Sequence, residues 1–87
     1  MINGKSFTQV VIDPHYEEKH AESVNDEIII GLVMQLDGKT FKPTDIDEDG
    51  YQYFVNDRLE HEGKLYKLIW LIHDEQVYVG VVNAYRR

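Results

Sequence analysis

The sequence predicts an α+β domain, because its first half has a helical hydrophobic period and its second half has the pattern of strands. Apolar residues at positions 24, 28, 32 and 36 fall on one face of a helix. Residues 51–59, 65–73 and 76–85 are instead rich in β-branched and aromatic residues and are separated by turn signals. We expect an N-terminal strand and one or two helices packed on one face of a twisted antiparallel meander of about four strands. The 87 residues suffice for one domain, residues 1–87.

The first half contains a strand and two helix start signals. Residues 7–12 are largely β-branched, which predicts a strand. The Asp-Pro dipeptide at residues 13–14 is typical of an N-cap and a first helical position, so a polar helix is expected over residues 15–20. Ser23, with Asp26 three positions later, resembles a capping box. This second signal predicts the start of the apolar helix.

The second half is predicted to consist of strands. Gly38 stands where a glycine commonly ends a helix. Residues 39–46 predict a short edge strand, because Pro43 interrupts them. An acidic turn follows at residues 45–50. Hairpin turns are predicted at residues 62–63 and 74–75.

The register of the last hairpin is predicted from a two-residue loop at residues 74–75. That loop pairs residue 70 with 79, 68 with 81, 66 with 83 and 64 with 85. One face of the hairpin is then apolar near the loop and becomes polar at the open end. The predicted polar cluster on that face is Tyr66, Asn83, Lys64 and Tyr85. Lys67 and Arg86 are predicted to lie on the opposite face.

Composition narrows the class of protein. The hydrophobic fraction is 43%, which is ordinary for a globular chain, and the net charge is −7. Such a charge argues against broad, non-specific nucleic-acid binding but permits a local site. The absence of cysteine excludes disulfides and thiolate metal sites and fits a reducing compartment, so we expect a cytoplasmic protein. We expect neither a signal peptide nor a membrane span, because the apolar runs are short.

Charge is distributed unevenly along the chain. Residues 1–62 carry 5 Lys or Arg against 14 Asp or Glu, a net −9. Residues 63–87 carry four basic side chains against Asp74 and Glu75, a net +2. A cationic strand end on an anionic body is a candidate anion site, although Arg86 and Arg87 also fit a solvated terminus.

Two patterns that resemble metal sites are better explained otherwise, and no metal or cofactor is predicted. His15 and His20 are five positions apart, which places them on different sides of a helix. A single imidazole beside Lys19 fits general acid or base chemistry, and a solvated helix face is the alternative. Residues 45–50 match the first half of a calcium-binding EF-hand loop, but Asn56 replaces the bidentate glutamate. An acidic turn is the simpler interpretation.

Aromatic residues are frequent in the predicted strands, at positions 51, 53, 54, 66, 70 and 78. They are compatible with base stacking. At alternating strand positions they are more typical of the core and surface of a small sheet.

Taken together, the layout resembles the small ribonuclease-toxin superfamily of barnase, EndoU, colicin-type ribonucleases and RelE-like toxins. The resemblance is to compact bacterial and phage members, and it covers residues 7–87. It is carried by the helix segment His15-Tyr-Glu-Glu-Lys-His20, by Tyr66-Lys67, and by the tail Asn83-Ala-Tyr-Arg-Arg87. The last strand has Asn83 where relatives often have serine or threonine.

The resemblance implies metal-independent RNA cleavage. His20 or His15 would take the proton of the 2′-hydroxyl. The side chains implied to stabilise charge on the phosphate are Lys19, Lys67 and Arg86. Asn83 and Tyr85 would position that phosphate, and the implied substrate contacts are Lys64, Tyr66, Lys67 and Arg86.

The resemblance also implies partners, namely RNA and a cognate antitoxin or immunity protein. An inactive relative of these ribonucleases remains open, because they are commonly basic and this chain is acidic. The alternative from a different class is a non-catalytic acidic interaction module, similar to an immunity protein or antitoxin, that binds a basic partner.

Overall fold

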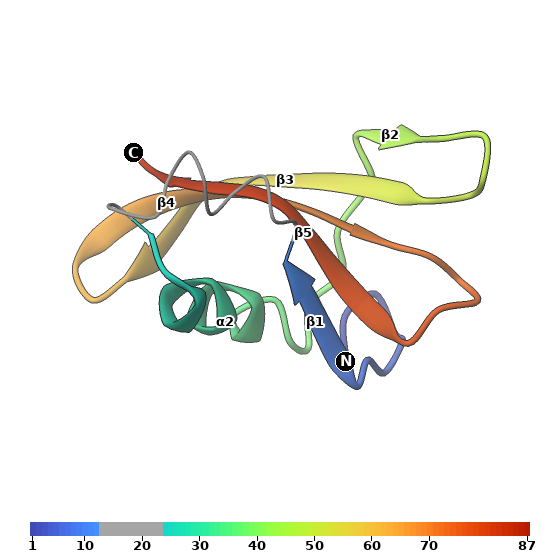
Figure 1. Cartoon of the computed structure of the whole chain (residues 1–87), viewed down its shortest axis with the longest axis horizontal. Helices are drawn as coiled ribbons and strands as arrows, with labels where there is room; N and C mark the ends of the chain where they lie inside the picture. The colour runs from blue at the N-terminus through green and yellow to red at the C-terminus, as the bar shows by residue number, and fades with distance from the viewer. Residues whose placement is uncertain (13–23) are drawn as a thin grey trace.

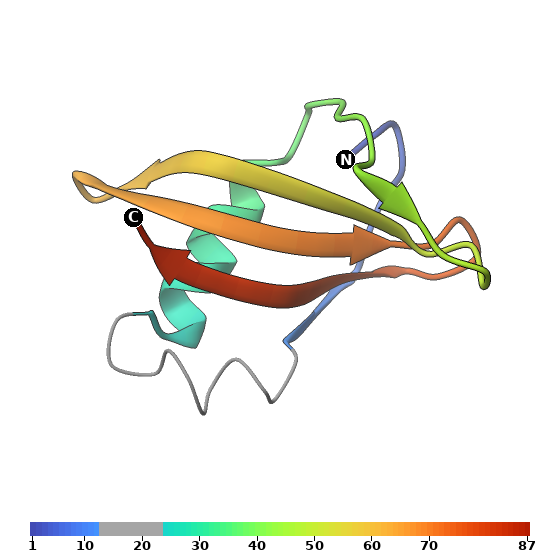
Figure 2. The same cartoon turned by 90° about the horizontal axis from the view of Figure 1, so that it is seen from above.

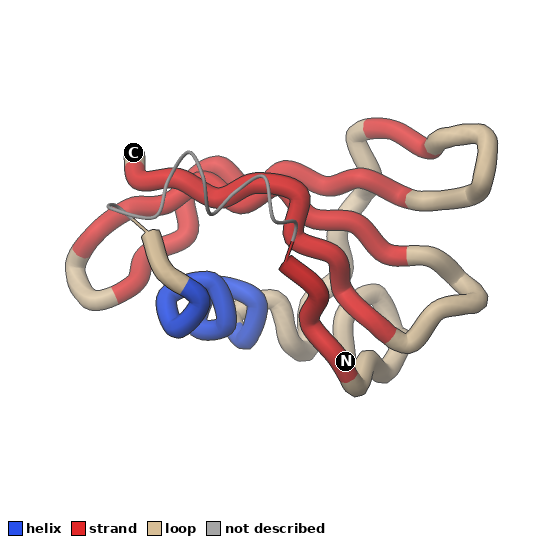
Figure 3. The backbone as a smooth tube through the Cα atoms, viewed as in Figure 1, coloured by secondary structure: helices blue, strands red, loops and turns tan. Residues whose placement is uncertain are grey.

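The computed structural model describes residues 1–12 and 24–87. Within them it has one helix and a five-stranded sheet, so the α+β class is confirmed (Figures 1 and 3). The elements are β1 Gln9–Ile12, α2 Asp26–Met34, β2 Asp45–Ile46, β3 Gln52–His61, β4 Lys64–Ile72 and β5 Tyr78–Arg86. The strand order is β1-β5-β4-β3-β2, and α2 lies against one face of the sheet (Figure 1). The polar helix expected over residues 15–20 lies outside the described residues.

The antiparallel meander is confirmed, and it consists of β2, β3, β4 and β5. β1 differs from the prediction, because it extends the sheet instead of packing on its face. It pairs with β5 in parallel, with Val10 opposite Val79 and Ile12 opposite Val81. A parallel neighbour requires a long connection, which here includes α2. The short edge strand predicted within residues 39–46 is confined to β2 at the end of that range, where Asp45 lies opposite Tyr53.

Helix α2 begins at a different cap from the predicted Ser23. Asn25 is the N-cap, and its Oδ1 accepts a hydrogen bond from the Ile28 amide (2.9 Å). The predicted apolar face is buried, with Leu32 fully enclosed. The helix ends at Met34 with Gln35 as its C-cap, and the turn that follows ends at Gly38, whose positive φ of 78° is a conformation that favours glycine.

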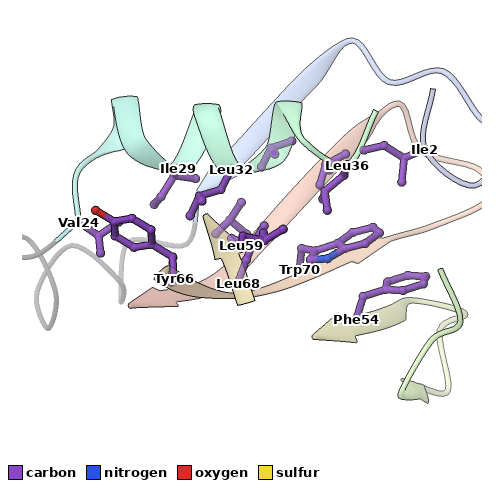
Figure 4. Packing of buried hydrophobic residues seen from close by; sticks show 14 of the residues in the cluster. Ile2, Val24, Ile29, Leu32, Leu36, Phe54, Leu59, Tyr66, Leu68 and Trp70 are labelled. Carbon is purple, nitrogen blue, oxygen red and sulfur yellow. The ribbon is translucent and has the colours of Figure 1, made fainter. Parts of the chain in front are cut away.

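The core lies between α2 and the central strands (Figure 4). Trp70 of β4 is fully buried and stacks on Phe54 of β3, with ring centroids 4.1 Å apart. Its indole N–H donates to Asn56 Oδ1 (2.7 Å). The remaining wall comes from Ile29 and Leu32 of the helix, both fully buried. This packing explains why β4 is the central strand: its buried side chains have both neighbouring strands and the helix to contact.

The predicted register of the last hairpin is wrong. Tyr66 lies opposite Arg86, three positions beyond the predicted partner Asn83. Part of the shift comes from the connection between β4 and β5, which is longer than two residues and contains a hydrogen bond from the Gln76 amide to the His73 carbonyl (3.1 Å). The rest comes from a bulge that leaves Val82 without a direct cross-strand partner in β4. An odd shift moves side chains to the opposite face.

Candidate site on the open face of the sheet

The face of the sheet opposite α2 carries no described helix, and we call it the open face (Figure 2). Alternation along β4 places Lys67, Ile69 and Leu71 on this face, since Leu68 and Trp70 are buried on the other. On β5 the bulge at Val82 resets the alternation. The residues beyond the bulge that share the open face are Asn83 and Tyr85, opposite Ile69 and Lys67.

Three of the predicted site residues are brought together at this position. Lys67 and Tyr85 are cross-strand partners, and the Lys67 Nζ lies 5.6 Å from the centre of the Tyr85 ring. An ammonium over an aromatic face is attracted by the ring quadrupole. Asn83 is two residues before Tyr85, and its Oδ1 accepts from the Ala84 amide (2.9 Å). A cation, a phenol and an amide thus share one end of the open face.

The structure separates the other predicted strand residues from this group. Tyr66 is only 3% exposed and belongs to the core on the helix side, where its ring lies 6.4 Å from that of His61. Arg86, its cross-strand partner, is exposed on that same side. Lys64 is exposed at the β3–β4 hairpin. The predicted face shared by Tyr66, Lys64, Asn83 and Tyr85 is therefore wrong, for the register reason given above.

Arg87 is exposed to solvent, as the alternative interpretation expects, and it also has partners in the sheet. The Arg87 amide donates to the Leu65 carbonyl (2.9 Å), and its guanidinium forms an ion pair with Asp57. The predicted catalytic residues His15, Lys19 and His20 lie outside the described residues. A histidine facing Tyr85 and Asn83 therefore stays a prediction.

A second group of side chains lies at the opposite end of the sheet. The Tyr53 hydroxyl donates to Asp47 Oδ2 (3.1 Å), while Asp47 Oδ1 accepts from the amides of Asp49 (2.9 Å) and Tyr51 (3.0 Å). The Tyr78 hydroxyl reaches across β4 to that of Tyr51 (3.2 Å). Three tyrosines and an acidic turn are connected in this way.

These contacts shift the acidities of the group. Desolvation by itself would raise the pKa of Asp47, but the hydrogen bonds from Tyr51, Tyr53, Asp49 and Gly50 together outweigh it and hold the pKa below its ordinary value. The pKa of Tyr53 is raised, first by its hydrogen bond to Asp47 and then by desolvation and the nearby carboxylates. The pKa of Tyr51 is raised by its hydrogen bond with Tyr78, with smaller contributions from Asp49 and Asp47. The acidic turn therefore creates a negative potential around the tyrosines.

His73 connects the acidic turn to the β4–β5 connection. Its Nδ1 accepts from the Glu75 amide (3.0 Å), which assigns the proton to Nε2, and Nε2–H then donates to the Asp49 carbonyl (2.7 Å). The ring also packs edge-on against Tyr51, with centroids 4.8 Å apart. One imidazole ring thereby connects the two loops.

A groove with a volume of about 290 Å³ runs over the open face beside the tyrosines. Its described lining includes Val11, Tyr53, Leu71, Tyr78 and Gly80. A Cβ at Gly80 would lie 2.7 Å from Leu71 Cδ1, so any other residue there would require the Leu71 side chain to shift. The sequence prediction did not identify this groove, although a glycine inside an apolar strand is a signal of close approach.

The described residues contain no group of three or more His, Cys, Asp or Glu side chains that is arranged to hold a metal ion. In the EF-hand-like turn, the carboxylate of Asp47 is engaged with amides and with Tyr53. No helix in the described part of the chain is both long and apolar enough to cross a membrane.

Comparison of the chain with protein-family models finds no matching family. Comparisons with curated proteins and with solved structures find no match either. The function must therefore be inferred from the residues and from the geometry of the open face.

Proposed function

We propose that this protein is a metal-independent ribonuclease of the RelE-like type, or an inactive relative, acting in the cytoplasm with RNA as substrate and an antitoxin or immunity protein as partner. The observation that supports this best is the pairing of Lys67 with Tyr85 beside Asn83. A lysine on an exposed sheet surface supplies a point charge for a phosphate. The adjacent phenol and amide supply hydrogen bonds that orient it.

The proposed reaction needs a base as well as this phosphate site. His20, or His15, takes the proton of a ribose 2′-hydroxyl, and the 2′ oxygen attacks the adjacent phosphorus. The bond from phosphorus to the 5′ oxygen breaks to leave a 2′,3′-cyclic phosphate, and the proton taken by the histidine is returned, through water, to the departing 5′ oxygen. Lys67 stabilises the extra negative charge on the phosphate oxygens in the transition state.

An RNA-cleavage assay at neutral pH tests the proposal. Wild type is compared with His20→Ala, Lys67→Ala and the control Lys42→Ala, which changes an exposed lysine in the loop after α2. We expect His20→Ala to lower the rate about 10²- to 10⁴-fold. Lys67→Ala should lower it about 10- to 100-fold, and Lys42→Ala should leave it unchanged. Cleavage that survives His20→Ala and His15→Ala would exclude this mechanism, and intact RNA with wild type would leave the inactive relative.

We propose as the second candidate a non-catalytic acidic module that binds a basic partner. It is favoured by the exposed carboxylates gathered on the two loops that His73 joins, which are Asp45, Glu48, Asp49, Asp74 and Glu75. Such a surface accelerates the encounter with a basic protein and disfavours the binding of acidic proteins. Binding that weakens with salt and survives His20→Ala supports this candidate. Binding that is insensitive to salt would exclude it.

A further inference from the structure

We propose that the groove between Tyr53, Tyr78 and Leu71 binds an arginine side chain of a basic partner protein. The inference rests on the second candidate function for the existence of that partner. The groove indicates where on this protein the partner makes contact and which residue of the partner is bound there.

The side chains that line the groove are suited to pack against a flat group of a ligand. Tyr53, Tyr78 and Leu71 are each half-buried, so part of each side chain is available. Gly80 has no side chain to fill the base of the groove. Val11 of β1 is 48% exposed and forms an apolar edge of the groove. A planar group that lies flat against aromatic faces fits these walls.

The negative charge around the groove favours a cationic ligand over an anionic one. None of the described lining residues is basic. Asp45 is exposed and lies opposite Tyr53 in the β2–β3 pair, so it shares the open face at the rim. Asp47 is bound to the Tyr53 hydroxyl. A guanidinium stacks on aromatic rings and pairs with carboxylates, whereas a nucleic-acid phosphate would be repelled here.

This contact is separate from the proposed phosphate site. Leu71 is four residues beyond Lys67 along β4, a distance of about 13 Å at ~3.3 Å per residue. The open face therefore has a cationic end at Lys67 and an anionic, tyrosine-lined end at Asp45.

The test is a titration of the full chain, followed by backbone amide NMR shifts, with a capped Gly-Arg-Gly-Arg-Gly peptide. The control peptide carries citrulline, the neutral isostere, at both arginine positions, and a uridine oligonucleotide tests the nucleic-acid alternative. We expect the arginine peptide to shift the amides of Tyr53, Tyr78 and Gly80, with weak binding by the citrulline peptide. Equal binding of both peptides would overturn the proposal. So would an oligonucleotide that shifts these amides when the arginine peptide does not.

Two substitutions place the contact. Tyr78→Leu should weaken the arginine peptide about 5- to 30-fold by removing an aromatic face. Asp45→Asn, a surface change, should weaken it about threefold, and Glu60→Gln, which removes an equal charge from exposed β3 surface, should have no effect.

The outcomes separate the two proposals. In one outcome, wild type binds the arginine peptide in a salt-dependent way while Tyr78→Leu and Asp45→Asn bind it as tightly as wild type does. That result supports the basic-partner function and shows that the groove is not where the arginine binds. If wild type binds neither this peptide nor a longer polyarginine, both fall.

Discussion

Lys67 and Tyr85 face each other across β4 and β5, with the lysine ammonium 5.6 Å from the centre of the tyrosine ring. The pair exists because the bulge at Val82 brings Tyr85 to the open face. A simple two-residue hairpin would instead have paired Tyr85 with Lys64, on the same face as the buried Leu68 and Trp70. The first prediction concerns this contact.

A double-mutant cycle of Lys67→Met and Tyr85→Leu should show a coupling of about 0.5–1 kcal/mol, the range for an exposed cation–π pair. Urea unfolding of the four proteins measures it. Lys64→Met, which changes an exposed lysine of the same strand that is not opposite Tyr85, should add to Tyr85→Leu within about 0.5 kcal/mol. Equal coupling for both lysines would show that the 5.6 Å contact has no specific effect.

The second prediction concerns the buried indole of Trp70. Asn56→Ala removes the acceptor of its N–H and should cost about 1–3 kcal/mol of unfolding free energy, because a buried donor is left unsatisfied. In a Trp70→Phe background no N–H remains, so the same change should cost clearly less. Gln76→Ala, an exposed turn substitution, should stay within about 0.5 kcal/mol. Equal costs of Asn56→Ala in the two backgrounds would contradict the hydrogen-bond explanation.

Gly31 and His61 provide a third prediction, because the helix and β3 approach closely at these two residues. A Cβ at Gly31 would lie 2.5 Å from His61 Cε1. Gly31→Ala should therefore destabilise wild type, although alanine is the better helix former by about 1 kcal/mol. Combined with His61→Ala, the same change should stabilise the protein by up to about 1 kcal/mol. Thermal unfolding of the three variants checks the change of sign, and destabilisation in both backgrounds would show that His61 is not the obstacle.

The fourth prediction is a pH dependence from Asp47. Its folded-state pKa lies below the ordinary value of 3.8, so the folded state favours the carboxylate. The resulting stability is fully present above pH 3.8 and is lost as the pH falls through the lowered folded pKa. Asp47→Asn should therefore have a lower free energy of unfolding at neutral pH. Its free energy of unfolding should also fall less steeply as the pH is lowered into the acid range.

Urea unfolding of Asp47→Asn between pH 7 and the acid range measures this. Glu48→Gln removes the same charge at an exposed neighbouring position and serves as the control. A flattening of equal size in both variants would assign the effect to net charge and not to the hydrogen bonds of Asp47.

The order and type of the described elements followed from local patterns. The helical spacing of the apolar residues predicted which face of α2 is buried. Ile29 and Leu32 lie on that face and are buried. Alternation in β4 predicted Leu68 and Trp70 as core for the same reason. These patterns depend on which side of one element faces water, and the sequence contains that information.

The candidate site was predicted less well. Lys67, Asn83 and Tyr85 were identified by residue type, but the expected neighbours Tyr66 and Lys64 were wrong. Residue type indicates chemistry, whereas neighbourhood depends on register. A longer turn and one bulge changed the register without a strong local signal in the sequence.

The sequence by itself determined the α+β class, the antiparallel meander and the unequal distribution of charge, since each depends on composition or on spacing within one element. The tertiary structure decided that β1 runs parallel beside β5, that Lys67 meets Tyr85, and that three tyrosines border a groove floored by Gly80. Those relationships join segments that are distant along the chain. They depend on how the strands pack together, a property that no single segment encodes.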